Sequence, residues 1–252
     1  MAGMNGRETE RLLQEALGLH QRGQVEAAMA LYELVLQEVP EHVEALHLLG
    51  VGSRQRGRAE EAVGRIAQAL ALNPGHATAH SNLGAALQDL DRTEDALASY
   101  ERALALRPDY PMALANSGNA LRRLGRVDEA IARYRRALAL QPRYPEALAN
   151  LAAALLTTGE LAEAREVVEA SLQWQPRSAQ AWCARGAIMQ RLGEAGEALA
   201  SYERALDCDG AHVETLVNLA TLAQQQRDHA AALEWAERAI GRAPRHAAAH
   251  LQ

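Results

Sequence analysis

Apolar residues recur along this chain in pairs of helical blocks that short polar turns separate. In the stretch from Ala77 to Tyr110, small and large apolar residues follow helical spacing over 79–90 and again over 94–106. The polar segment 91–93 interrupts the pattern, and Pro108 closes it, because proline lacks an N–H and keeps its predecessor out of the helical region. The stretch therefore predicts a helix, a turn, a second helix and a stop.

This pattern repeats every 34 residues along nearly the whole chain. The repeats begin at Thr9, Val43, Ala77, Pro111, Pro145, Ala179 and Val213. The position that closes the pattern is proline in six of seven repeats: Pro40, Pro74, Pro108, Pro142, Pro176 and Pro244, with Gly210 in the remaining one. A small residue recurs in each first helix at Ala16, Gly50, Gly84, Gly118, Ala152, Gly186 and Ala220. A fixed period of this length predicts a solenoid, in which each helix pair buries its apolar face against its neighbours.

The turn inside each repeat has its own signature. Glycine stands between the two helices at positions 23, 57, 125, 159 and 193, where a left-handed helix end suits it. Asp91 and Arg227 take this place in two repeats, so we expect those turns to differ. Leu83, Leu121 and Leu155 fall on the apolar stripes and are expected to be buried.

The repeat closely resembles the tetratricopeptide repeat (TPR) over nearly the whole chain. The resemblance implies an all-α fold, a right-handed superhelical solenoid of stacked antiparallel helix pairs, with seven repeats and the start of an eighth. We expect a flexible lead over 1–8, the solenoid over 9–246 and an incomplete first helix over 247–252. Since no polar capping helix follows, we interpret the chain as a fragment of a longer protein; a natural end with a frayed or partner-covered edge is the alternative.

Composition excludes several classes of protein. No apolar run is long enough to span a membrane, and the N-terminal segment has no apolar signal core. Abundant alanine, with arginine as the only basic side chain besides histidine, is typical of a GC-rich bacterial coding sequence. Cys183 and Cys208 therefore predict reduced thiols in a cytoplasmic protein rather than a disulfide.

Charge is uneven along the chain. The net charge is −6, aromatic content is 4% and no extended basic stripe appears, which argues against a nucleic-acid partner. The repeat at 111–144 is rich in arginine, whereas the repeats on either side are acidic. Salt bridges between neighbouring repeats are the favoured explanation. The alternative is an anion-binding patch in a groove, for which Arg122 and Arg123 at the end of a first helix are best placed.

We expect no catalytic, cofactor or metal site. The sequence has no phosphate-binding glycine loop and no convincing pair of nucleophile and base, so the chain is not expected to be an enzyme. His76 with His80, and His246 with His250, have the spacing of two metal ligands on one helix face. However, histidine recurs at the last position of four repeats, 42, 76, 212 and 246, and is better interpreted as a feature of the repeat junction.

Asparagine recurs at the sixth position of four repeats, as Asn82, Asn116, Asn150 and Asn218. Asparagine in mid-helix costs up to roughly 0.7 kcal/mol relative to alanine, so its recurrence needs a reason. Either each amide forms hydrogen bonds within the repeat junction, or the set faces a ligand.

The array resembles the asparagine ladder of O-linked N-acetylglucosamine transferases and bacterial Spindly-like proteins, and the segment 42–57 resembles their early repeats. That resemblance implies that first helices line a concave groove, where ladder amides bind the backbone of an extended peptide. An amide suits this role because it offers donors and an acceptor to a peptide unit. The ladder is incomplete, because Gln14, Leu48 and Ala184 hold the matching positions.

A rival peptide-binding mode is less consistent with the sequence. TPR domains that grip the acidic tails of heat-shock chaperones use two asparagines, which Asn119 and Asn150 could supply, together with several cations. Ala115, Gln180 and Ala184 stand where those cations are needed, so we reject this mode.

The sequence thus predicts a non-catalytic scaffold that binds protein or extended peptide, and by resemblance the substrate-recruiting arm of a larger glycosyltransferase. The candidate binding residues are Asn82, Asn116, Asn119, Asn150, Asn218, Arg122 and Arg123. The alternative is an assembly scaffold that forms homo-oligomers through an exposed C-terminal edge. That edge would draw on Leu216, Leu219, Leu222 and Leu233.

Overall fold

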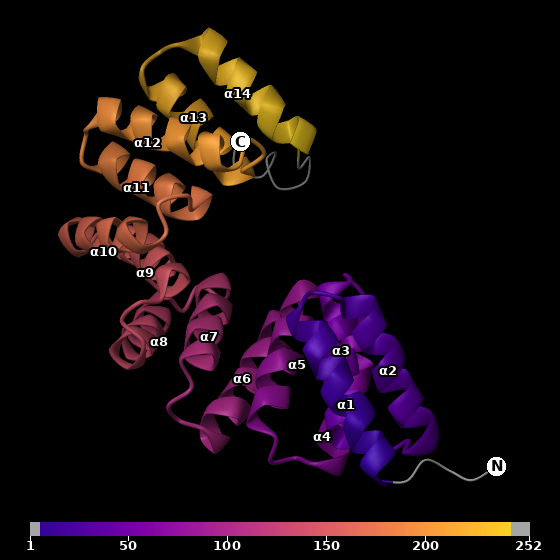
Figure 1. Cartoon of the computed structure of the whole chain (residues 1–252). Helices are drawn as coiled ribbons and strands as arrows, with labels where there is room; N and C mark the ends of the chain where they lie inside the picture. The colour runs from indigo at the N-terminus through magenta and orange to yellow at the C-terminus, as the bar shows by residue number, and fades with distance from the viewer. Residues whose placement is uncertain (1–5, 243–252) are drawn as a thin grey trace. The chain divides into compact units, whose positions relative to one another are not determined.

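A computed structural model describes residues 6–242 of the chain (Figure 1). This described part contains fourteen helices and no strand, in agreement with the expected all-α fold. None of these helices is both long and apolar enough to cross a membrane.

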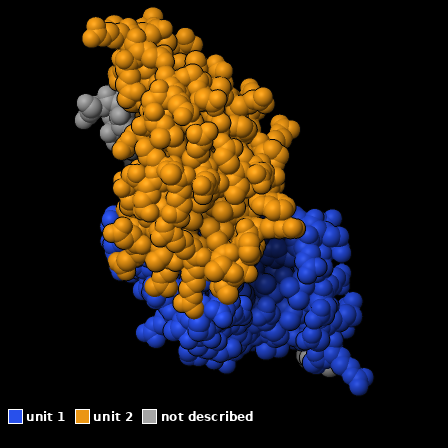
Figure 2. All heavy atoms as spheres, turned by 90° about the vertical axis from the view of Figure 1, so that its left-hand side faces the viewer, with its two compact units in different colours: residues 1–126 blue, residues 127–252 orange. Residues whose placement is uncertain are grey.

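The chain divides into two compact units, residues 1–126 and 127–252 (Figure 2). Unit 1 holds α1 (Gly6–Gln21), α2 (Val25–Glu38), α3 (Val43–Gln55), α4 (Ala59–Leu72), α5 (Ala77–Asp89), α6 (Thr93–Leu106) and α7 (Pro111–Arg123). Unit 2 holds α8 (Val127–Leu140), α9 (Pro145–Thr158), α10 (Leu161–Trp174), α11 (Ala179–Arg191), α12 (Ala195–Cys208), α13 (Val213–Gln225) and α14 (His229–Arg242). The boundary between the units falls between the two helices of the repeat at 111–144.

Helix starts follow the period of the sequence. Six first helices, α3, α5, α7, α9, α11 and α13, begin at the residue where the pattern places the start of a repeat. Helix α1 differs, because it begins at Gly6 and so takes in three residues of the expected flexible lead. The expected eighth first helix at 247–252 lies outside the described residues.

Neighbouring helices pack against each other inside each unit. Within a repeat, α1 packs on α2, α3 on α4 and α5 on α6, and in unit 2 α9 packs on α10, α11 on α12 and α13 on α14. First helices also contact one another, α3 with α5 and α5 with α7 in unit 1, and α9 with α11 and α11 with α13 in unit 2. The first helices α3, α5 and α7 therefore form a layer in unit 1, and α9, α11 and α13 form one in unit 2.

The turns inside the repeats adopt the left-handed backbone conformation that their glycines predict. Five glycines have φ between 74° and 87°, at positions 23, 57, 125, 159 and 193. The expectation that the turns at Asp91 and Arg227 differ was wrong, because these residues have φ of 58° and 61° and keep the same left-handed geometry without glycine. The left-handed conformation at a residue with a Cβ costs roughly 1–2 kcal/mol, and packing of the flanking helices must offset this.

A close contact between a glycine and an aromatic ring joins the two helices of a repeat. Tyr100 and Tyr202 are fully buried, and a Cβ on Gly84 would lie 2.6 Å from the ring of Tyr100. The same Cβ on Gly186 would lie 2.5 Å from the ring of Tyr202. Each tyrosine hydroxyl donates to a glutamine 12 residues earlier, Tyr100 to Gln88 at 2.6 Å and Tyr202 to Gln190 at 2.7 Å. The ring is therefore fixed at both ends, by packing and by a hydrogen bond.

Two of the three leucines expected in the core are fully buried. Leu121 and Leu155 have almost no exposed surface. Leu83 is only partly buried, so the expectation for it was wrong. It packs against Ile66, Leu70 and Ala79, and its outer side reaches the surface of the first-helix layer.

The glycine–tyrosine contact predicts opposite responses at two helical glycines of unit 1. Gly84→Val should lower the free energy of unfolding by roughly 1–3 kcal/mol, because the added methyl groups overpack a fixed ring. Gly64→Val is the matched control, since nothing lies within 4 Å of a Cβ at Gly64. That variant should be neutral or slightly stabilising. Urea denaturation of both variants tests this; equal stabilities would show that the Tyr100 ring yields to the added group.

Candidate functional site

All seven candidate binding residues lie on first helices. In unit 1, α5 carries Asn82, and α7 carries Asn116, Asn119, Arg122 and Arg123. In unit 2, α9 carries Asn150 and α13 carries Asn218. Asn150 is buried, the other asparagines are half-buried and both arginines are exposed. The structure therefore brings the candidates onto the first-helix layer of each unit.

Three of the ladder amides form hydrogen bonds to a neighbouring first helix. Asn82 Nδ2 lies 2.8 Å from His47 Nε2, and Asn218 Nδ2 donates to Cys183 Sγ at 3.4 Å. Both pairs are 35 residues apart in sequence, so they occupy the same register in two different repeats. Asn150 Oδ1 accepts a bond of 2.6 Å from Gln180 Nε2. These amides thus hold neighbouring repeats together.

These bonds use only part of what the amides offer. An asparagine side chain has two N–H donors and an oxygen with two lone pairs. One bond to a neighbouring helix fixes the orientation of the amide and leaves further donors or lone pairs for a second partner. The structural role and a ligand-binding role are therefore compatible in the same side chain.

A second row of polar pairs crosses from one first helix to the next near their C-terminal ends. His20 Nε2 lies 3.0 Å from Gln55 Oε1, Arg54 Nε donates to Asp89 Oδ2 at 2.7 Å, and Gln190 Nε2 donates to Gln225 Oε1 at 2.9 Å. Each of these pairs is again 35 residues apart. This row was not predicted from the sequence, although polar residues recur 34 residues apart at the ends of first helices and carried the signal.

The arginine-rich repeat forms ion pairs with its acidic neighbours. Arg123 Nη2 donates to Asp91 Oδ1 at 2.6 Å in unit 1, and Arg135 Nη2 lies 2.8 Å from Glu163 Oε2 in unit 2. Arg122 is exposed and forms no ion pair with any residue of the described part. Of the two candidate arginines, Arg122 is thus the one whose charge is available to a ligand.

Histidines at the repeat junctions cap first helices. His42 Nδ1 accepts from the backbone N–H of Ala45, and His76 Nδ1 accepts from that of Ala79, both at 3.2 Å. His212 stands at the same place before α13 without such a bond, and His246 and His250 lie outside the described residues. The recurrence of histidine therefore has a structural cause in two repeats.

His76 and His80 do not share partners, although their spacing suggested it. His80 Nε2 donates to the backbone oxygen of Pro74 at 3.0 Å. His76 instead faces α3, where its Nε2 lies 3.3 Å from Glu44 Oε2 and its ring centroid lies 4.8 Å from that of His47. The polar interaction with His47, and then that with His76, lowers the pKa of Glu44 to about 2 against the opposing effect of burial.

The two cysteines are free thiols. Cys183 is buried, and burial raises the pKa of its thiol to about 12. Because the thiolate is the nucleophile, this side chain is unsuited to covalent chemistry near neutral pH.

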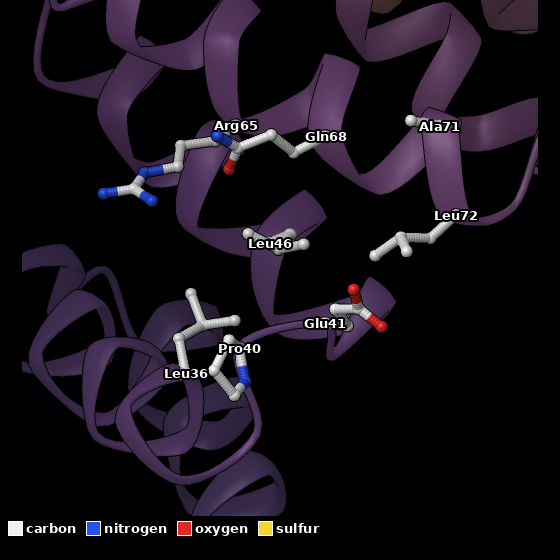
Figure 3. Close-up of a pocket in the computed structure, with 8 residues that line it drawn as sticks. All are labelled: Leu36, Pro40, Glu41, Leu46, Arg65, Gln68, Ala71 and Leu72. Carbon is white, nitrogen blue, oxygen red and sulfur yellow. The ribbon is translucent and has the colours of Figure 1, made fainter.

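A hollow of about 450 Å³ opens on the second-helix side of unit 1, between α2, α3 and α4 (Figure 3). Leu36, Leu46 and Leu72 supply apolar surface, and Arg65 and Glu41 supply opposite charges. It shares no residue with the first-helix candidates.

The last described helix exposes an apolar edge. Leu216, Leu219 and Leu222 on α13 are buried, whereas Leu233 and Ile240 on α14 have 62% and 43% of their surface exposed. The residues at the same places in the third repeat, Leu97 and Leu104, are only 9% and 7% exposed. Within the described residues, no further repeat covers Leu233 and Ile240.

Comparison with known proteins identifies the repeat. Models of the tetratricopeptide repeat match residues 77–110, 145–178, 179–212 and 213–243, and a model described as TPR repeat matches 118–159. No curated protein sequence matches the chain significantly.

Solved structures share the fold at low sequence identity. PilF of Pseudomonas aeruginosa is 25% identical, with a TM-score of 0.66 over 80% of this chain and 92% of PilF. A tetratricopeptide repeat protein from Parabacteroides merdae is 19% identical, with a TM-score of 0.75 over 94% of each chain. The TPR protein YrrB is 22% identical, with a TM-score of 0.58 over 73% of this chain and 95% of YrrB. With its period, its helix pairs and these matches, the chain belongs to the tetratricopeptide-repeat family.

Proposed function

We propose that this chain is a non-catalytic scaffold that binds an extended polypeptide on the first-helix layer. The observation that carries the proposal is asparagine at one position of several first helices, Asn82 and Asn116 in unit 1 and Asn150 and Asn218 in unit 2. Bonds to a neighbouring first helix hold three of them, Asn82, Asn150 and Asn218, in orientation. Arg122 adds a cation on the same set of helices. YrrB, which shares the fold, is described as a TPR protein with an unusual peptide-binding site.

The free energies of hydrogen bonding and of association limit the affinity of such a site. Four amides that make one or two hydrogen bonds each, at a net of roughly 0.5–1.5 kcal/mol per bond, contribute on the order of 2–12 kcal/mol. Association itself costs roughly 4–15 kcal/mol, so the surplus is small. A short peptide should therefore bind in the micromolar to millimolar range or more weakly. Side-chain sequence should matter little, apart from a preference for acidic residues near Arg122.

The finer hypothesis is that the bound polypeptide is a substrate held for a larger glycosyltransferase. It rests on the asparagine pattern alone. Weak, sequence-tolerant binding suits such an arm, because tethering to a second site raises the effective concentration without new contacts.

The peptide-binding proposal predicts that loss of the asparagine amides weakens peptide affinity more than it lowers the stability of the fold. Replacing Asn82, Asn116 and Asn150 together with alanine should weaken binding of a fluorescein-labelled Gly-Ser-Glu repeat peptide at least tenfold. The loss of two inter-helix bonds should lower the free energy of unfolding by only about 1–3 kcal/mol. Fluorescence anisotropy and thermal denaturation measure the two effects.

Asn73→Ala is the matched control for that experiment. Asn73 lies in the turn after α4, where it accepts a bond from the backbone N–H of Gly75, and it is not on a first helix. This variant should bind the peptide as the wild type does. If the triple variant loses stability but keeps wild-type affinity, the amides are structural and the proposal fails.

The exposed edge of α14 favours a second candidate function, assembly of copies of the chain. Leu233 and Ile240 expose apolar surface at places that are buried in the third repeat, and such surface is suited to a contact between two molecules.

The assembly proposal predicts self-association that depends on this edge. Wild-type protein should show a mass that rises with concentration in sedimentation equilibrium, and the Leu233→Glu, Ile240→Glu double variant should stay monomeric. Leu106→Glu is the control, because Leu106 is also an exposed helical leucine but lies on α6. A wild-type protein that stays monomeric at millimolar concentration would rule this function out.

A further inference from the structure

We propose that Glu44, His47 and His76 form a binding site for a divalent metal ion of the zinc class. One carboxylate oxygen of Glu44, a ring nitrogen of His47 and one of His76 all lie within 4.8 Å of one another. Two imidazoles and one carboxylate form a ligand set that Zn²⁺ uses when it keeps a fourth position open. Nitrogen donors favour Zn²⁺, Co²⁺ or Ni²⁺ over Mg²⁺ and Ca²⁺.

The repeat architecture of unit 1 brings these three residues together. Glu44 and His47 are three residues apart on α3, so their side chains share one face of that helix. His76 is the residue that precedes α5, and α5 contacts α3 directly. The ligands therefore come from two first helices in contact, across one repeat junction.

His47 provides independent evidence for a missing partner. The residue is 3% exposed, and its Nδ1 is a buried atom with no hydrogen-bond partner. The nearest carboxylate oxygen, Glu44 Oε1, lies 3.8 Å away, which is too far for a hydrogen bond. Buried polar atoms in proteins nearly always have a partner, so an orphaned nitrogen that faces a carboxylate and a second imidazole indicates a ligand between them.

The separations are close to those that a metal ion needs. Bonds of about 2.0–2.1 Å in a tetrahedral site place the ligand atoms roughly 3.3 Å apart. Glu44 Oε2 and His76 Nε2 are already 3.3 Å apart, and Glu44 Oε1 and His47 Nδ1 are 3.8 Å apart. These two distances use different oxygens of Glu44, and the three ligand atoms of the cluster span up to 4.8 Å. Binding therefore requires the Glu44 side chain, which is 41% exposed, and the ring of His76, which is 20% exposed, to move toward the ion.

Asn82 supports the site from behind. Its amide lies 2.8 Å from His47 Nε2, the ring nitrogen that faces away from Glu44. As placed, Asn82 Nδ2–H donates to Nε2, which puts the ring proton on Nδ1. When the amide turns by 180°, its oxygen accepts from Nε2–H and leaves a lone pair on Nδ1 for a metal ion. Asn82 is thus a positioning residue, which gives one of the ladder amides a separate role.

One hydrogen bond opposes binding. His76 Nδ1 accepts from the backbone N–H of Ala79, which places the proton of the neutral ring on Nε2. A metal ion on Nε2 moves that proton to Nδ1 and breaks the bond. The bond is long, at 3.2 Å, and α5 keeps its remaining backbone hydrogen bonds, so we expect this to reduce the affinity without preventing binding.

Titration of the untagged full chain with Zn²⁺, followed by calorimetry, tests the site. The wild type should bind one ion per chain with an affinity in the micromolar range. Glu44→Gln removes the charge and keeps the shape, and His76→Asn removes the imidazole while asparagine remains a good helix N-cap. Each of these two variants should weaken binding at least tenfold.

His42→Asn is the matched control, because His42 caps α3 as His76 caps α5 but lies outside the cluster. It should bind Zn²⁺ as the wild type does. Co²⁺ should also give the visible absorption of a tetrahedral ion in the wild type and in His42→Asn, and lose it in the two cluster variants.

Two results would overturn the proposal. The first is a wild type that takes up no Zn²⁺ at millimolar concentration. The second is equal affinity in the wild type, the cluster variants and the control, which would place the ion elsewhere. The test is independent of peptide binding, since it measures the metal ion alone.

Discussion

The contact between a glycine on a first helix and a buried tyrosine on its partner is the constraint on which the rest of the structure depends. Gly84 meets the ring of Tyr100, and Gly186 meets that of Tyr202, at distances that leave no room for a side chain. Because the ring is held at its hydroxyl as well, the two helices of each of these repeats have one way to pack. Each repeat still has an uncovered apolar face, which the next repeat buries, and the chain is stable only as a stack.

Stacking of this kind places first helices side by side and generates the candidate sites. Side chains at neighbouring positions on successive first helices meet across the junction, so pairs 35 residues apart recur. The polar row near the helix ends and the pairs of Asn82 with His47 and of Asn218 with Cys183 follow from this offset. Asn150 with Gln180 and Glu44 with His76 cross the same kind of junction at separations of 30 and 32 residues. A site of this type needs no loop or insertion, because the contact between helices already brings the polar groups together.

The sequence predicted the elements well because their signals are local. Proline spacing and the apolar period located the starts of six first helices, and the glycine positions predicted left-handed turns. The prediction failed at Asp91 and Arg227, where the helix pair imposes the same turn without glycine. The side-chain partners could not be predicted in the same way. Asn82 with His47, and His76 with Glu44, are joined across repeats, and only the packed register shows which positions face each other. Leu83 was wrongly predicted to be buried for the same reason, because the apolar stripe of a single helix does not show where the packed layer of helices meets solvent.

Amide hydrogen exchange, resolved helix by helix, tests most directly the claim that neighbouring repeats hold one another in place. Helices covered on both sides should exchange more slowly than those at an end of the described chain. In unit 1, α5 should be better protected than α1, and in unit 2, α11 should be better protected than α14. Equal protection of all helices within a unit, or better protection of α1 and α14, would contradict the account.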